Sequence, residues 1–101
     1  MKITRDISVG KVYKIAEILK TIGHPLRLKI LETLEKEEPL CVSEIQERIP
    51  ISAEQSLLSH HLIKMKDKGI LNSEKKGMHV YYAIQDRELL KIFDCMENCS
   101  L

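Results

Sequence analysis

Residues 54–71 read EQSLLSHHLIKMKDKGIL, and this stretch decides how the rest of the chain is interpreted. Leu58, Leu62 and Met65 recur at intervals of four and three residues, the spacing of a core-facing helical stripe. Gly69 provides a stop for that helix. The opposite face is in large part polar and carries Gln55, Ser56, Ser59, His60, Ile63 and Lys64. The question is whether the two adjacent histidines bind a metal, serve catalysis or belong to a DNA-reading surface.

The residues just before this helix indicate a shorter helix and a tight turn. Ser43 and Gln46 match the S-x-x-Q capping box at the start of SEIQERI, which Pro50 closes. Ser52 and Gln55 form a second match nine residues later. Two helices, each with its own cap and separated by a tight turn, are typical of a helix-turn-helix, here over about residues 43–69.

Helical spacing also marks the first third of the chain. Residues 11–22, KVYKIAEILKTI, carry apolar side chains at helical intervals and end at Gly23. Pro25 then stands at the first position of PLRLKILETLEK, where proline is well tolerated. The sequence therefore predicts two further helices ahead of the helix-turn-helix.

The pattern changes after Gly69. Residues 71–84 alternate with a period of two and bend at KKG, which predicts a β-hairpin. A final helix follows over about residues 86–99, with Asp86 as its cap. The expected fold is mainly α with a small β-hairpin, a winged helix-turn-helix in the order helix-helix-helix-helix-strand-strand-helix.

Length and composition bound the class of protein. A chain of 101 residues suits one domain, and 44% hydrophobic with 31% charged residues is typical of a folded, soluble protein. No apolar run approaches the roughly 20 residues that span a bilayer, and the first residues lack a signal-peptide segment. We expect a cytoplasmic protein without a membrane partner, in which three cysteines do not form a structural disulfide framework.

The net charge of +1 hides a strong pattern. Residues 1–31 carry seven bases and two acids, and residues 54–82 carry five bases and three acids. Residues 32–53 and 83–101 are acidic in balance. Because nucleic acid responds to a local basic face, a near-neutral total does not exclude it as a partner.

The residues offer little for catalysis. The chain has no H-E-x-x-H motif, no glycine-rich phosphate loop and no convincing pair of nucleophile and base. On a helix, His60 and His61 point about 100° apart and cannot easily share one metal ion. We therefore predict that the protein is not an enzyme, with His60 outward and His61 inward.

Four blocks in one order carry a family resemblance: LKTIGHPLRLKILETL, CVSEIQERI, QSLLSHHLIKMKDKGIL and KKGMHVYYAI. Together, over about residues 15–84, they resemble the ArsR/SmtB-type bacterial repressors. The resemblance implies a homodimeric winged helix repressor that binds double-stranded operator DNA. It also implies release from DNA when a metal ion, a metalloid or a sulfur oxidant binds. One departure is His24 before Pro25, where the family usually has aspartate.

The resemblance places the family's reading positions on this chain. Its Gln-Ser pair falls on Gln55 and Ser56, and its Ser-x-His segment falls on Ser59, His60 and His61. With three cations of the helix and the hairpin, the expected DNA-binding set is Gln55, Ser56, Ser59, His60, Lys64, Lys75 and Lys76. For Gln55 the alternative is closure of the capping box; for the others it is a solvated surface. Met78 and His79, near the hairpin tip, are either further DNA contacts or simply exposed.

The cysteines are the candidate residues for an inducer site. Cys95 and Cys99, four apart on the expected last helix, could bind a soft metal or metalloid, alone or with Cys41. The alternative is that the cysteines are small buried hydrophobes. Neither metal site of the family is intact, because the places of its ligands read CVS from Cys41 and DRE from Asp86.

Two regions are expected to form a dimer. Residues 11–22 and 86–99 carry more apolar side chains than the core of a small monomer needs. The competing function is a winged-helix protein-interaction module with neither an operator nor an inducer, which the polar helix face and the basic hairpin disfavour.

Overall fold

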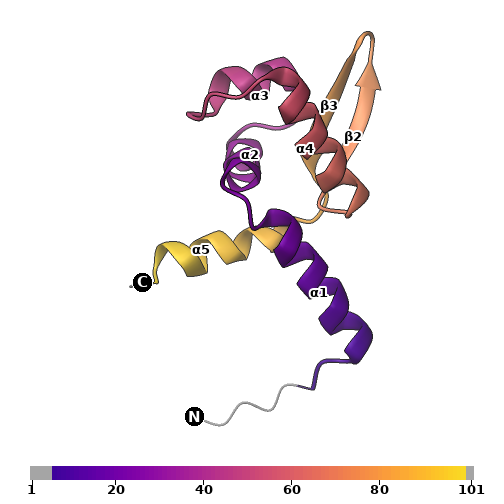
Figure 1. The fold of residues 1–101 in the computed structure, drawn as a ribbon, viewed down its shortest axis with the longest axis vertical. Coiled ribbons are helices and arrows are strands. Elements are labelled where there is room, and N and C mark those ends of the chain that lie inside the picture. Colours follow the sequence, from indigo (N-terminus) through magenta and orange to yellow (C-terminus); the bar gives the residue numbers. More distant parts are fainter. Residues whose placement is uncertain (1–5, 100–101) are drawn as a thin grey trace.

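The computed structural model describes residues 6–99. Figure 1 shows a compact middle part from which the hairpin projects at one end and α1 and α5 project at the other. The elements in chain order are α1 (Val9–Ile22), α2 (Pro25–Lys36), β1 (Leu40–Cys41), α3 (Val42–Arg48), α4 (Gln55–Asp67), β2 (Leu71–Lys76), β3 (His79–Ile84), a 3-10 helix η1 (Arg87–Leu90) and α5 (Lys91–Glu97). The winged helix-turn-helix expected from the sequence is confirmed.

The core forms where α2, α3 and α4 meet the base of the sheet. Its most deeply buried side chains come from the helical stripes and have almost no exposed surface: Ile30, Leu31, Leu34, Ile45, Leu58, Leu62 and Met65. Each such side chain contributes about 1.5–3 kcal/mol through removal of its apolar surface from water. The predicted stripe of α4 is therefore buried as a unit, which leaves the other face of this helix toward solvent.

The wing is an antiparallel hairpin with the expected turn. Leu71 pairs with Ile84 at its base and Lys76 pairs with His79 at its tip. Gly77 in the turn has a φ of 64°, a left-handed conformation that glycine adopts without strain. The sequence missed a third strand: β1 pairs with β3 through Leu40 and Cys41, giving the order β1-β3-β2.

The predicted capping boxes are wrong in detail. Helix α3 begins at Val42, and its box forms two residues earlier than expected, with the Glu44 carboxylate accepting from the Cys41 backbone N–H at 3.0 Å. This hydrogen bond lowers the pKa of Glu44. Helix α4 begins at Gln55 after Glu54, without a side-chain cap, so Ser52 and Gln55 do not form the second box.

The C-terminal part also differs from the single helix expected over residues 86–99. Asp86 accepts from the Glu88 backbone N–H, as a cap should, but the helix that it caps is η1. Helix α5 follows and ends at Glu97. Cys99 therefore lies beyond the helix, and the prediction that it shares a helical face with Cys95 is wrong.

Helix α1 is poorly covered by the other described residues. It is capped by Ser8 and begins two residues before the expected start. Large apolar side chains along it are exposed, as is one on α5: Val9, Val12, Tyr13, Leu19 and Met96. Among the described residues, no helix is long and apolar enough to cross a membrane.

Candidate nucleic-acid interface

The exposed face of α4 carries most of the residues that the sequence selected for DNA contact. Gln55, Ser56, His60 and Lys64 are exposed, and Ser59 is half-buried. These side chains come to one face because the residues between them form the buried stripe. A helix held by one face on the core, with short polar side chains near its free N-terminal turns, has the form that enters the major groove.

A side-chain bridge from α3 to α4 holds the turn of the helix-turn-helix. The Gln55 side-chain amide donates to the Gln46 side-chain oxygen at 3.1 Å, and the Gln46 amide donates to the Ala53 carbonyl at 2.8 Å. Gln55 thus does not cap α4, and its side chain is already held by a hydrogen bond to Gln46 before any DNA is bound. It is positioned by α3, and its own carbonyl group remains available as an acceptor.

The two adjacent histidines are separated by the helix, as predicted. His60 is exposed, whereas His61 is only 6% exposed. The Nδ1 atom of His61 accepts from Arg27 Nε at 2.9 Å, and its ring centroid lies 4.7 Å from that of His24. Burial, aided by the charge of Arg27, lowers the pKa of His61 and keeps the imidazole neutral. His61 therefore joins α4 to α2 and is not a reading residue.

His24 has a defined role at the junction of α1 and α2. Its Nδ1 atom accepts from the Leu26 backbone N–H at 3.1 Å and so caps α2. The neighbouring Arg27 guanidinium also donates to the Thr21 carbonyl at 2.8 Å. The imidazole of His24 thus performs the capping, and it gives Arg27 no acidic partner.

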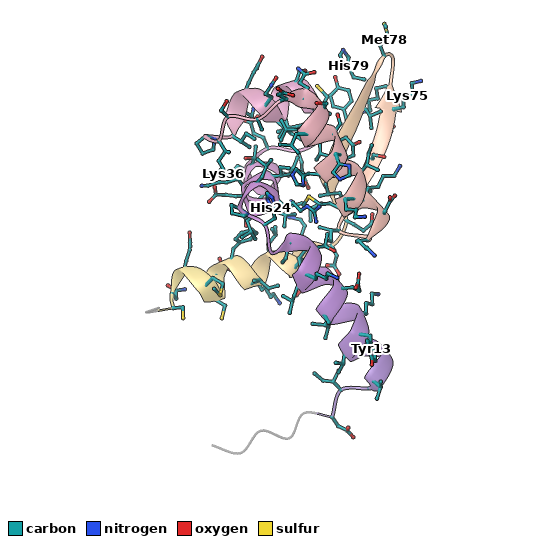
Figure 2. All side chains as sticks on the ribbon, viewed as in Figure 1. Tyr13, His24, Lys36, Lys75, Met78 and His79 are labelled. Atoms are coloured by element: carbon teal, nitrogen blue, oxygen red, sulfur yellow. The ribbon has the colours of Figure 1, made fainter. Side chains whose placement is uncertain are left out.

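The wing supplies the second group of candidate DNA contacts. Lys75, Met78 and His79 gather at its tip (Figure 2), and all three are exposed. Lys76 is exposed as well, with its Nζ atom 6.0 Å from the centre of the Tyr81 ring. This distance lies at the limit of a cation–π contact, and the exposed cation remains accessible to phosphate.

The candidate lysines of α4 and the wing form none of the ion pairs found among the described residues of the domain. Within residues 6–99, the ion pairs engage Lys29, Arg48, Lys68, Arg87 and Lys91. Lys64, Lys75 and Lys76 take part in none of these pairs. Their charge is available to an anionic ligand.

A groove joins the reading face of α4 to the wing. Helix α4 contributes Gln55, Ser59 and Ile63 to it, and the wing contributes Met78, His79, Val80 and Tyr82. The start of α3 closes the groove with Cys41, Val42 and Ser43. The sequence placed Ile63 on this face but did not select it as a site residue, because an exposed isoleucine carries no polar signal.

The three cysteines do not form a site within the protomer. Cys41 is buried, with its Sγ atom 3.3 Å from the Ser43 hydroxyl, whereas Cys95 and Cys99 are exposed. In the part of the chain that the structure describes, no group of three His, Cys, Asp or Glu side chains is arranged to hold a metal ion. A metal site that uses all three thiols is thus not preformed in one protomer.

The reading helix, the wing and the groove between them define a DNA-binding protein of the winged helix-turn-helix class. The family model described as "Bacterial regulatory protein, arsR family" matches residues 24–73. The chain is 41% identical over 71 residues to the transcriptional repressor PagR of Bacillus anthracis, covering 70% of this chain and 69% of PagR. It is 38% identical over 87 residues to the HTH-type regulator MJ1325 of Methanocaldococcus jannaschii, covering 83% and 96%.

Structural comparison agrees with the sequence relatives. The crystal structure of PagR has a TM-score of 0.76 and 34% identity, covering 88% of this chain and 99% of that one. A further relative, the cadmium resistance regulator CadC of Listeria innocua, is 34% identical over 84 residues, covering 83% of this chain and 69% of CadC. The chain belongs to the ArsR family of transcriptional regulators, and its function is DNA-binding regulation of transcription.

Proposed function

We propose that the chain is a cytoplasmic, homodimeric repressor that reads operator DNA with the exposed face of α4 and holds the phosphate backbone with the wing. The observation that carries this proposal is the groove in which Gln55 and Ser59 of α4 lie opposite His79 of the wing. Lys64, Lys75 and Lys76, which form no ion pair among residues 6–99, add the charge that a polyanion requires. PagR, a relative at 41% identity, is named as a repressor.

The roles of the individual residues follow from their positions. Ser56, Ser59 and His60 lie in the first two turns of α4, where side chains reach base edges in a helix-turn-helix complex. A glutamine can contact adenine, and Gln55 does so while its amide stays bonded to Gln46. The lysines are assigned to phosphates, which set affinity and register without reading sequence.

Dimerisation is assigned to α1 and to the region of η1 and α5. Val12 and Leu19 are 48% and 49% exposed, and Met96 is 59% exposed, although all three are strongly apolar. Figure 1 shows both helices standing away from the middle of the protomer. A two-fold pairing of these helices would cover the apolar surface and present two reading helices to an inverted repeat, one helical turn of about 34–36 Å apart.

The proposal includes an inducer that acts on thiols. Cys95 is exposed on α5 and Cys99 is exposed just beyond its end, and a dimer through this helix would bring the thiols of both protomers to one interface. Thiolates favour soft metals and metalloids, and the relative CadC is named for cadmium resistance. We assign these two thiols, and not the buried Cys41, as the site of an inducing metal or metalloid ion.

A selection from random double-stranded DNA tests the central proposal. The full chain should enrich an inverted repeat, bind it in a gel-shift assay and bind less tightly as salt is raised. Failure to enrich any sequence would reject operator reading and would favour a winged-helix protein-interaction module. The thiol site is tested on the same duplex: Cd²⁺ or arsenite should release the wild-type protein but not the Cys95→Ser, Cys99→Ser double variant.

A further inference from the structure

We propose that Ile63 is a specificity-determining residue that contacts the C5-methyl group of a thymine in the major groove. The inference rests on the proposed function and adds to it one base position that is selected by an apolar contact. Ile63 is 52% exposed on a helix whose apolar residues are otherwise mostly buried in the core.

The position of Ile63 on α4 supports a contact with DNA. It follows Ser56 by seven residues, and two helical residues so spaced differ by only about 20° in direction. It also follows Ser59 by four residues, one turn further along the same face. Ile63 thus extends the polar reading stripe and points away from the core, as Ser56 does.

The chemistry of DNA gives such a side chain one matching partner. Base edges in the major groove present hydrogen-bond donors and acceptors, and their only apolar group is the methyl of thymine. An isoleucine on a groove-facing helix gains by excluding water from that methyl and gains nothing from the polar edges of the other bases. The expected preference is therefore thymine over cytosine at the contacted position.

The distance along the helix agrees with this assignment. Ile63 lies eight residues after Gln55, which corresponds to about 12 Å of helix at 1.5 Å per residue. A recognition helix lies in the major groove with its N-terminal residues at base edges. When the first turn of α4 contacts bases, Ile63 therefore faces base edges about 12 Å further along the helix.

The surroundings of Ile63 favour the same partner. It lines one groove with Met78 and Val80 of the wing, which are 95% and 37% exposed. The exposed cation of Lys64 follows it directly in α4. In this arrangement Ile63 would contact the methyl group of a thymine while the adjacent Lys64 would contact a nearby phosphate. If Ile63 served only to support the wing, its removal would not change the response of binding to a methyl group on the DNA.

Replacement of thymine by deoxyuridine tests the contact directly, because it removes only the methyl group and leaves the base pair intact. The duplex enriched from random DNA by the wild-type chain is the probe, with each thymine replaced in both half-sites, one symmetric pair at a time. Affinity is measured by fluorescence anisotropy. At one position, loss of both methyls should weaken wild-type binding on the order of tenfold, from about 0.8 kcal/mol per buried methyl.

The Ile63→Ala variant should bind the thymine duplex with a similarly reduced affinity and should not distinguish it from the deoxyuridine duplex. Leu57→Ala is the matched control, because Leu57 is 46% exposed on the flank of α4 and should retain the full response to the methyl. Thermal melting confirms that both variants are folded. A methyl response that persists in Ile63→Ala, or no responsive thymine at all, overturns the assignment while leaving operator binding intact. Failure to enrich any duplex would reject both proposals.

Discussion

Arg27 Nε donates a hydrogen bond to His61 Nδ1 at 2.9 Å, and this one contact joins α2 to the buried side of the reading helix. The Arg27 guanidinium also donates to the Thr21 carbonyl, so the same side chain connects α1, α2 and α4. This contact, in which the His61 ring accepts the proton of Arg27 Nε, therefore adds to the buried apolar stripe in holding α4 in place.

Removal of Arg27 should destabilise the domain. In Arg27→Ala the buried Nδ1 atom of His61 loses its donor, and an unsatisfied buried polar group costs about 1–3 kcal/mol in the free energy of unfolding. Urea denaturation followed by circular dichroism measures this loss. Arg48→Ala is the control, since the pair of Arg48 with Glu37 is largely exposed and should contribute no more than about 1 kcal/mol. Equal losses in the two variants would contradict the role given to Arg27.

The stability of the domain should fall at mildly acidic pH because of His61. The folded protein holds the pKa of His61 below its unfolded value of about 6.5, so the unfolded chain binds more protons as pH decreases. The stabilisation is complete above pH 6.5 and is lost as the pH falls from there toward the lower pKa of the folded state. The loss is at most about 1.4 kcal/mol per pH unit.

Urea titrations between pH 5 and pH 8 measure this slope. The His61→Gln variant should lose its contribution to the slope, whereas His60→Gln, which alters an exposed side chain, should retain it. A wild-type slope that survives in His61→Gln would assign the proton uptake to another group.

Substitution of His24 by aspartate should stabilise the protein. A carboxylate caps a helix as well as or better than other side chains, and it would also supply the negative charge that the Arg27 region lacks. We expect a gain of about 0.5–1 kcal/mol at pH 7. His24→Ala, which removes the cap without adding charge, should lose a similar amount, and a Tm measured by thermal melting should rank the three proteins accordingly.

Negative charge on the reading face should abolish operator binding without unfolding the protein. In the double variant Ser59→Glu, His60→Glu, two carboxylates would face DNA from the second turn of α4. Lys36→Glu changes the net charge by the same amount, and Figure 2 shows Lys36 on the side away from the wing. Gel-shift assays should therefore show loss of binding in the double variant only. Undiminished binding by that variant would remove the second turn of α4 from the interface.

The wing lysines should contribute to affinity mainly by binding phosphates. For Lys75→Gln, Lys76→Gln, binding should weaken by a similar factor on specific and unrelated duplexes. The slope of log K against log salt concentration should decrease by about 0.9 for each phosphate that the variant no longer neutralises. Anisotropy titrations at several salt concentrations give both quantities. An unchanged slope would show that the wing does not touch the backbone.

The sequence predicted the elements whose pattern is long enough to read. The apolar stripe of α4 and the alternation in residues 71–84 each extend over several turns or residue pairs, and burial confirms both. Periodicity cannot reveal β1, because two residues have no period; Leu40 is recognised as a strand only through its pairing with Tyr82.

The caps and the candidate site show a different limit. Several polar side chains near a helix start can form hydrogen bonds with the same backbone groups. Which of them does so depends on the tertiary fold. Glu44 reaches the Cys41 amide, while Gln46 and Gln55 bond to each other across the turn. The inward direction of His61 followed from helical geometry, but its partner Arg27 lies 34 residues away in the chain and leaves no local signal.

The two-residue strand β1 has a consequence for the choice of operator. Leu40 and Cys41 pair with Tyr82 and Tyr81 of β3 directly before α3 begins. This pairing attaches the wing to the start of the helix-turn-helix. Glu38 reinforces this attachment by accepting from the Ile84 backbone N–H at 3.0 Å. With the spacing between α4 and the wing set in this way, a duplex of different groove width has to bend or twist to fit. The energy of that distortion depends on base composition, so base pairs that no side chain touches can contribute to selection.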